Sequence, residues 1–261
     1  MINISIINRI KQKSDHQNNI SSKAITFISA RSGVGTTFLA LNLAYTVSEL
    51  SLRPTLFIDM DTERPDATLF FADENYKGVD DVLPIISSNS SIGSEVLEQY
   101  ITNFRKINFL FGSNIKDSEL FLDGFTSKLI NLTKQAYAYV FIDAGTNFTN
   151  DALLSSDAII VVADQNVAIL SETADMVRSF SDEVKTKTFV IINKYSDEVS
   201  FKVKDMKELF DLNFLATVSS IDLNALNIMY ARKFIYSIKE KKYKKINNEL
   251  EGVGRYIIEN V

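Results

Sequence analysis

The sequence predicts an α/β fold: a single doubly wound, mainly parallel sheet of about seven strands with helices on both faces. Short apolar runs alternate with amphipathic stretches, and each run is continuously apolar, as expected for strands buried on both faces. Such alternation of strands and helices favours parallel pairing through right-handed crossovers. With only 9 glycines and 3 prolines in 261 residues, little chain is left for long linkers, so we expect one domain.

The elements follow in order along the chain. Strands are expected at 24–30, 55–59, 107–111, 139–143, 158–163, 187–192 and 213–218. Helices are expected between them, at 36–50, 94–103, 118–137, 168–183, 200–210 and 222–240. A last helix fits 245–260, where one apolar stripe (Ile246, Leu250, Val253 and Ile257) favours docking on the body of the domain rather than insertion in a membrane.

Residues 1–22 are predicted to be a polar arm or linker ahead of a domain at 23–261.

The composition excludes several classes of protein. The absence of cysteine excludes disulfides, zinc ribbons and iron–sulfur clusters, and a single histidine, His16, argues against a histidine-based triad. A net charge of −5 excludes a strongly basic coat for nucleic acid. No apolar run reaches about 18 residues, so a cytoplasmic protein without a membrane-spanning helix is expected.

The strongest chemical signal is the loop between the first predicted strand and helix, Ser29-Ala30-Arg31-Ser32-Gly33-Val34-Gly35-Thr36-Thr37. Gly33 and Gly35 allow backbone conformations and close approaches that a Cβ would forbid. Amides of such a loop and of the following helix can surround a phosphate. Thr37 is placed to offer a hydroxyl to Mg²⁺. A plain tight turn is the alternative interpretation.

Three aspartates stand at the ends of predicted strands: Asp59 and Asp61 in LFIDMD, and Asp143 in YVFID. The carboxyl ends of parallel strands meet at the crevice where α/β sheets bind ligands, so these carboxylates should converge on the loop. A single aspartate there often only caps the next turn or helix. The loop and the aspartates together therefore predict a phosphate and Mg²⁺ site.

The ordered set of motifs resembles one family. SARSGVGTTFLALNLA is similar to the deviant Walker A loop (Lys-Gly-Gly-Val-Gly-Lys-Thr) of the MinD/ParA family of ATPases, LFIDMD resembles its switch I strand and YVFID its Walker B strand. GVDDVL (78–83), INFLFGS (107–113) and VIINK (190–194) match further motifs of that family in the same order. The resemblance covers roughly residues 23–240.

This resemblance implies ATP and Mg²⁺ as cofactors and a homodimer as the active form. It assigns phosphate binding to the loop residues Arg31, Ser32, Gly33, Val34, Gly35, Thr36 and Thr37. It assigns contact with the adenine base to Asn193, although an asparagine at this place can also simply end a strand. Asp61 would orient the attacking water, while Thr37, Asp59 and Asp143 would serve the Mg²⁺ shell. Because Asn193 is followed by Lys194-Tyr195-Ser196 and not by Lys-x-Asp, selectivity for adenine over guanine is expected.

The departures from the family pattern carry information too. Arg31 stands at the family's signature lysine, which reaches the partner subunit's ATP, and keeps its positive charge. Thr36 stands at the general P-loop lysine and has no charge, which removes a contact of about 1.5–3 kcal/mol. Ser32 replaces a glycine. At most a slow ATPase is therefore expected.

A loop without that lysine resembles the TadZ/CpaE-like branch, whose members position the Tad pilus machinery. It implies a nucleotide-dependent, dimerising switch that organises a larger assembly and is recruited to the membrane or a cell pole through its protein partners. The alternatives are a ParA-type DNA-segregation or MinD-type positioning ATPase, and an enzyme such as a kinase or ligase, against which Thr36 counts. The lysines of 239–245 would serve DNA, an acidic membrane surface or an acidic protein, or they are simply solvated at a helix end.

Overall fold

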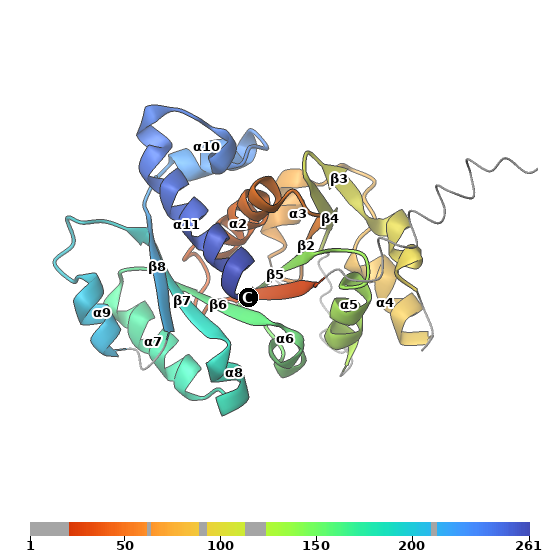
Figure 1. Ribbon diagram of the computed structural model, residues 1–261, viewed down its shortest axis with the longest axis horizontal. Helices are drawn as coiled ribbons and strands as arrows, with labels where there is room; N and C mark the ends of the chain where they lie inside the picture. Colours follow the sequence, from red (N-terminus) through yellow and green to blue (C-terminus); the bar gives the residue numbers. More distant parts are fainter. Residues whose placement is uncertain (1–20, 62–63, 89–92, 113–123, 210–212) are drawn as a thin grey trace, which may run out of the picture.

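A computed structural model describes residues 21–61, 64–88, 93–112, 124–209 and 213–261. Within these ranges the chain forms one sheet of eight strands between two layers of helices (Figure 1). The strands are β1 Lys23–Ile28, β2 Thr55–Asp59, β3 Thr102–Phe104, β4 Ile107–Leu110, β5 Tyr139–Gly145, β6 Ala158–Ala163, β7 Thr188–Tyr195 and β8 Asn213–Ser219. The predicted residues 1–20 of the arm lie outside the described residues.

The strand order is β3-β4-β2-β5-β1-β6-β7-β8, which places β1 and its following loop at the centre of the sheet. All neighbours pair in parallel except β3 and β4, which are antiparallel. The predicted doubly wound, mainly parallel sheet is thus confirmed. The expected number of strands was one too low, because β3 is a three-residue edge strand with no apolar run of its own.

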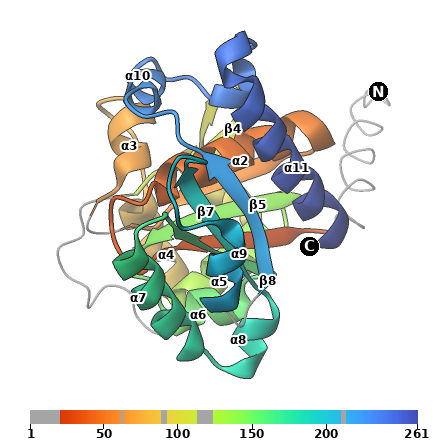
Figure 2. The same cartoon turned by 90° about the vertical axis from the view of Figure 1, so that its left-hand side faces the viewer.

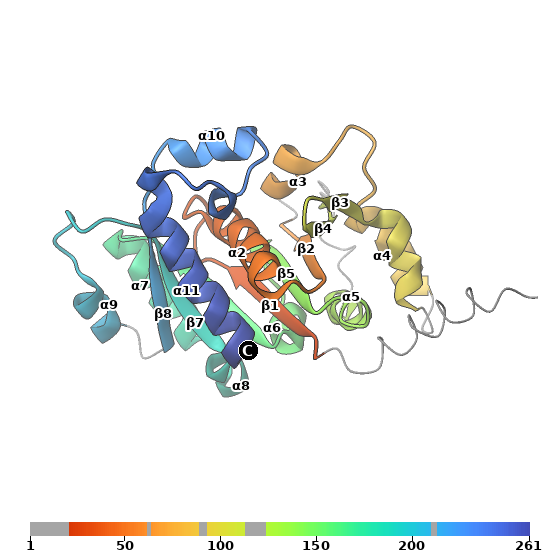
Figure 3. The same cartoon turned by 45° about the horizontal axis from the view of Figure 1, so that its top comes forward.

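The helices cover both faces of the sheet, as Figures 2 and 3 show from two further directions. The α-helices are α2 Thr36–Ser51, α3 Asp66–Phe71, α4 Val79–Ser88, α5 Phe125–Thr133, α6 Asn150–Ser155, α7 Val167–Arg178, α8 Asp182–Thr186, α9 Val203–Leu209, α10 Asn224–Tyr230 and α11 Lys244–Asn260. Within the described ranges, 3-10 helices span Ser94–Tyr100, Ile235–Ser237 and Lys241–Tyr243. Helices α2, α3, α10 and α11 lie on one face, and α5 to α9 lie on the other.

Several predicted helices are corrected. The predicted helix 168–183 is two helices, α7 and α8, because the Ser181 hydroxyl caps a new helix at Val184 N. The predicted helix 222–240 ends at Tyr230, since Arg232 adopts a left-handed conformation (φ 48°). The predicted helix 94–103 is a 3-10 helix followed by β3, and 118–137 is helical only in α5, with 118–123 outside the described residues. The short helices α3, α4 and α6 were not predicted.

Helix α11 is part of the core. Its predicted stripe is buried: Ile246, Leu250, Val253 and Ile257 are at most 3% exposed and pack with α2 and the sheet. Each such burial contributes about 1.5–3 kcal/mol relative to an exposed side chain, so the helix stays docked on the domain. In the described part of the chain no helix has the length and apolar character needed to cross a membrane.

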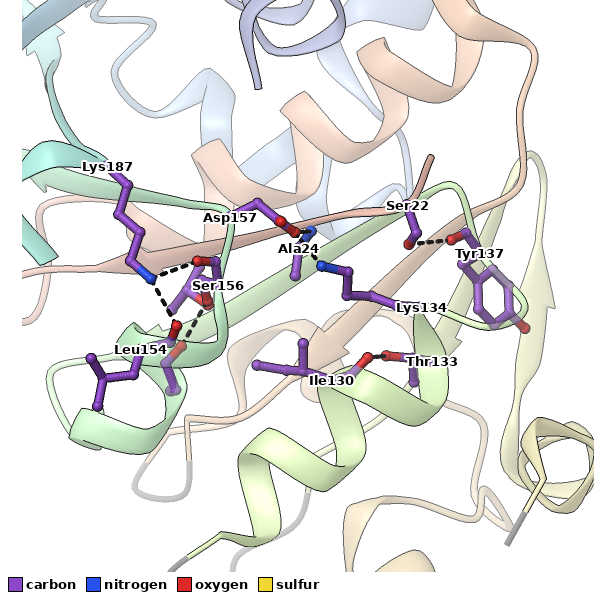
Figure 4. Close-up of polar contacts among 12 residues, drawn as sticks. Ser22, Ala24, Ile130, Thr133, Lys134, Tyr137, Leu154, Ser156, Asp157 and Lys187 are labelled. Carbon is purple, nitrogen blue, oxygen red and sulfur yellow. Dashed lines mark hydrogen bonds and ion pairs between the residues drawn. The ribbon is translucent and has the colours of Figure 1, made fainter. Parts of the chain in front are cut away.

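The amino ends of the central strands are joined by a cluster that we call the amino-end cluster (Figure 4), made of Ala24, Lys134, Ser156, Asp157 and Lys187. Asp157 Oδ2 accepts from the Ala24 amide (2.7 Å) and from Lys134 Nζ (2.7 Å). Lys187 Nζ donates to the carbonyls of Leu154 (2.8 Å) and Ser156 (2.9 Å) at the end of α6. These bonds tie β1, α5, α6, β6 and β7 to one another.

Candidate functional site

A cavity of about 580 Å³ lies at the opposite edge of the sheet, where β1, β2, β5, β7 and β8 end. Its lining residues come from the loop after β1 and from the ends of the other strands; they include Ser29, Ser32, Gly33, Gly35, Thr36, Thr37, Asp61, Arg64, Gly145, Asn193, Lys194, Ser219, Asp222, Leu226 and Met229. This volume suits a small ligand, and the position is the usual ligand crevice of an open α/β sheet.

The loop after β1 forms one wall of the cavity through its backbone. Gly33 and Gly35 have φ values of 85° and 89°, a region that favours glycine. A Cβ on Gly35 would also lie 2.4 Å from Asn193 Nδ2, so this position has no room for a side chain. Gly35 precedes α2 and offers no side-chain cap, which leaves the first amides of α2 open to an anion. Val34 is buried in the core and does not line the cavity.

Asp59 and Asp143 sit side by side, as a register pair of β2 and β5, and are at most 1% exposed. Asp59 Oδ2 accepts from the amide (3.0 Å) and hydroxyl (2.8 Å) of Thr68, which ties it to α3. Its Oδ1 and both oxygens of Asp143 have no hydrogen-bond partner in the ranges that the structure describes. Three buried carboxylate oxygens without donors are costly for the fold unless a ligand completes them.

The electrostatics reflect this burial. Loss of water raises the pKa of Asp143 to about 7, with Asp61 adding to the rise; the Thr37 hydroxyl and the Gly145 amide, which face Asp143 without completing a hydrogen bond, oppose it. Burial, followed by the charge of Asp143, raises the pKa of Asp59 as well. Both carboxyl groups are thus held in an environment that favours either a proton or a cation.

Asp61 lines the cavity and lies against Gly145. Its carboxylate accepts from the Arg64 amide (3.0 Å). A Cβ on Gly145, whose φ is 55°, would approach Asp61 Oδ2 to 2.2 Å, so glycine is required there for Asp61 to keep its place.

Asn193 and Lys194, at the end of β7, lie against the loop. Asn193 is 4% exposed and its Nδ2 donates to the carbonyl of Val34 (2.9 Å) and weakly to that of Gly35 (3.5 Å). Lys194 Nζ donates to the carbonyl of Gly33. The amide hydrogens of Asn193 are therefore engaged by the loop, and only its oxygen is left for a ligand.

Arg31 is a predicted site residue that does not line the cavity. Its guanidinium forms a two-pronged ion pair with Glu172 of α7, and the Arg31 side chain is 54% exposed. The predicted residues Ser32, Gly33, Gly35, Thr36, Thr37, Asp61 and Asn193 line the cavity. Asp59 and Asp143 lie beside Asp61 and Thr37.

Sequence reasoning missed the far end of the cavity. Ser219 to Asp222, Leu226 and Met229 form this end, following β8 and on α10. The Glu249 carboxylate of α11 accepts from the amide (2.8 Å) and hydroxyl (2.7 Å) of Ser219 and so fixes where this wall begins. No local pattern in the sequence marks these residues, because their role depends on the packing of α11.

The donor set fits Mg²⁺ in company with a phosphate. No group of three or more His, Cys, Asp or Glu suited to a metal occurs among the described residues, so protein side chains alone do not make a closed site there. The unpartnered oxygens of Asp143 and the Thr37 hydroxyl are hard oxygen donors, which Mg²⁺ prefers. Mg²⁺ commonly uses one or two such protein ligands together with phosphate oxygens and water.

Comparison with known proteins agrees with this geometry. Residues 25–226 match the model of the CobQ/CobB/MinD/ParA nucleotide binding domain. An uncharacterized protein of Methanocaldococcus jannaschii is 26% identical over 209 residues, covering 72% of this chain and 79% of that protein.

Two solved structures share the fold. A ParA family ATPase from Chlorobium tepidum has a TM-score of 0.74 at 12% identity, covering 90% of this chain and 99% of its own. The septum site-determining protein MinD of Pyrococcus horikoshii, complexed with Mg-ADP, has a TM-score of 0.68 at 20% identity, covering 91% and 96%.

Proposed function

The chain belongs to the family of CobQ/CobB/MinD/ParA nucleotide-binding domains, and from this premise we propose that it is an ATP-binding switch whose nucleotide-driven homodimer organises a larger assembly. The observation that carries the proposal is the meeting, at the carboxyl edge of the sheet, of the loop that walls the cavity with two buried carboxylates that keep three unpartnered oxygens. The amides suit a polyphosphate, and the carboxylates suit its Mg²⁺. The MinD structure with Mg-ADP supports this choice of ligand.

The homodimer is supported by the surroundings of the cavity. Arg31 is exposed and does not line the cavity of its own chain, which suits a residue that acts on a partner's nucleotide. Leu69, Leu223 and Tyr230, on or next to α3 and α10, are 74–75% exposed, and Leu226 extends this apolar rim from the cavity itself. Exposed apolar side chains beside a cavity favour contact with another protein surface.

Slow turnover follows from Thr36. An uncharged side chain at this position gives no cation to the phosphoryl group in its transition state, which lowers the rate by roughly two orders of magnitude. Slow hydrolysis lengthens the lifetime of the ATP-bound dimer, so the dimer state carries the function. We expect Thr36→Lys to raise the rate of hydrolysis, and a wild-type rate of order 1 s⁻¹ or faster would contradict a slow switch.

The mass of the protein in solution tests the switch directly. Light scattering is measured with no nucleotide, with ADP and with ATP–Mg²⁺, and only the last should give a dimer. Arg31→Ala should remain monomeric with ATP, whereas Asp61→Ala should dimerise like the wild type. A mass that is the same in all three conditions overturns the dimerising switch, and an Arg31→Ala dimer overturns the role of that arginine alone.

A protein assembly is a better partner for this switch than DNA. In the segment 239–245, Lys242 pairs with Glu240 (3.2 Å), Lys245 pairs with Asp197 (3.0 Å), and Lys239 lies over the ring of Tyr236. These contacts leave less positive charge for a phosphate backbone. The TadZ/CpaE-like role, with recruitment to a membrane or cell pole through partners, remains our preferred form of the function, and ATP-dependent DNA binding would favour the ParA-type alternative instead.

The preference for adenine also remains part of the proposal. Asn193 has its amide hydrogens on the loop, so its free carbonyl oxygen suits the 6-amino group of adenine and not the 6-oxo group of guanine. Competition for bound ATP by GTP with equal strength would contradict this preference.

A further inference from the structure

Consecutive backbone carbonyls of the loop after β1 accept hydrogen bonds from side chains at the end of β7. Lys194 Nζ donates to Gly33 O, and Asn193 Nδ2 donates to Val34 O (2.9 Å) and reaches Gly35 O (3.5 Å). These contacts join parts of the chain that are about 160 residues apart in sequence. They are therefore tertiary contacts, and no local conformational preference of the loop produces them.

Holding the carbonyls also orients the amides. In a trans peptide the N–H points opposite to the C=O of the same peptide plane. The carbonyls of Gly33 and Val34 face β7, so the amides of Val34 and Gly35 face the inner side of the loop. Inward-facing amides of this kind make an anion-binding concavity.

The backbone at Lys194 is shaped for this contact. Lys194 has φ 52°, an uncommon conformation for a residue with a side chain, and the β7–β8 register shifts between Ile192 and Tyr195. Such local strain persists where the surrounding structure holds it, and it is concentrated at functional sites. At Lys194 it directs a long, otherwise exposed side chain across the cavity wall to the loop.

On the basis of the proposed function, we infer that Lys194 is a positioning residue for polyphosphate binding, which holds the Gly33 carbonyl so that the loop amides are aimed at the phosphates. The device matters more in this chain than in one with a lysine in the loop. Thr36 supplies no charge at the phosphates, so the oriented amides provide a larger share of the binding.

Three variants test the inference in the full-length protein. Lys194→Met keeps the stem and loses the donor, and Lys194→Arg keeps a donor and the charge. The matched control is Lys239→Met, because Lys239 Nζ also donates to a backbone carbonyl, that of Tyr236 (2.9 Å), outside the cavity. Melting temperatures without nucleotide establish that each variant folds.

The readout is the dissociation constant of ATP, measured by calorimetry, and that of inorganic tripolyphosphate, measured by displacement of ATP. We expect Lys194→Met to weaken both by about tenfold, Lys194→Arg to restore most of the loss, and Lys239→Met to match the wild type. The loss should persist in 0.5 M salt, where long-range attraction is screened.

Other outcomes overturn the inference in distinguishable ways. A loss for ATP without a loss for tripolyphosphate makes Lys194 a wall for the nucleoside, and a loss that disappears in 0.5 M salt makes it only a distant charge. Tripolyphosphate that fails to compete in the wild type, or a Lys194→Met variant equal to the wild type, also overturns it. A wild-type protein that binds no ATP overturns the proposed function itself.

Discussion

Asp157 and Asp143 lie at opposite ends of the same sheet and have opposite surroundings. Asp157, in the amino-end cluster of Figure 4, is 28% exposed in its side chain, and one of its oxygens receives both an amide and a lysine ammonium. Asp143 has no exposure, and neither oxygen has a partner in the described chain. The partly exposed carboxylate is satisfied by donors, whereas the fully buried one is not.

The difference shows what each end of the sheet is built for. At the amino end, polar groups complete one another and stabilise the strands that they join. At the carboxyl end, three of the four oxygens of Asp59 and Asp143 have no donor among the described residues, and the first amides of α2 have no side-chain cap. This arrangement lowers the stability of the fold and creates a binding site. Changes at the two ends should therefore move the free energy of unfolding in opposite directions.

Asp157→Ala should have the largest effect, a loss of about 2–3 kcal/mol in the free energy of unfolding. The change leaves the Ala24 amide and the Lys134 ammonium without their acceptor. Urea unfolding measures the loss, and Asp175→Ala, which breaks an exposed pair with Arg178, is the control and should cost less than about 0.5 kcal/mol. Equal costs for the two variants would contradict the comparison.

Asp143→Asn should have the opposite sign and raise the free energy of unfolding without nucleotide by about 1–2 kcal/mol at pH 7.5. The neutral amide removes a buried charge that has no partner and can donate to Asp59 beside it. The matched substitution Asp157→Asn at the amino end should destabilise. Urea unfolding in the absence of Mg²⁺ measures both variants. An Asp143→Asn protein less stable than the wild type would contradict a destabilising charge at Asp143.

The pH dependence sharpens the same comparison. Because the folded-state pKa of Asp143 is raised to about 7, the folded protein keeps a proton that the unfolded chain loses near pH 4. Its stability without nucleotide should therefore fall as the pH rises from about 5 to about 7, by about 2 kcal/mol, and Asp143→Asn should flatten the fall. Asp197 and Glu251 have lowered pKa values, so their contributions are lost only in more acidic solution. Stability that rises with pH over this interval, in urea unfolding, would contradict the assignment.

Lys187→Met should have the smallest effect, a loss of about 0.5–1 kcal/mol. Lys187 donates to two carbonyls at the end of α6, and burial lowers the pKa of its ammonium group. Removing it exposes those carbonyls to water, which replaces part of the lost bonding. Thermal unfolding measures this loss against the control Lys241→Met, which changes a surface lysine. Equal stability of the two variants would mean that the hydrogen bonds of Lys187 to the end of α6 do not stabilise the fold.

Local pattern accounts for what could be predicted from the sequence. The strand 55–59 was expected with the bounds that β2 has, because its apolar run is short and ends in polar residues on both sides. The loop residues and the strand-end aspartates were placed together because strand order in a parallel sheet brings carboxyl ends to one edge. Edge strand β3 and the early end of α10 escaped prediction, since each depends on its tertiary neighbours.

The contacts that complete the site depend on long-range packing. The pairing of Arg31 with Glu172 and that of Lys194 with Gly33 join residues 141 and 161 positions apart. No periodicity or motif in the sequence specifies which side chain meets which carbonyl across that distance. The engagement of the Asn193 amide by the loop, and with it the loss of a donor for the base, was likewise visible only in the folded chain.

We propose that the carboxyl end of the sheet binds a nucleotide with Mg²⁺ and that the carboxylate of Asp143 completes its coordination only when the cation is bound. Calorimetric titration of ATP into the wild type and Asp143→Asn proteins, each with Mg²⁺ and with EDTA, tests it most directly. We expect Mg²⁺ to tighten ATP binding to the wild-type protein by about tenfold or more and to change ATP binding to Asp143→Asn little. Equal wild-type affinity with and without Mg²⁺, or no binding at millimolar ATP, would contradict it.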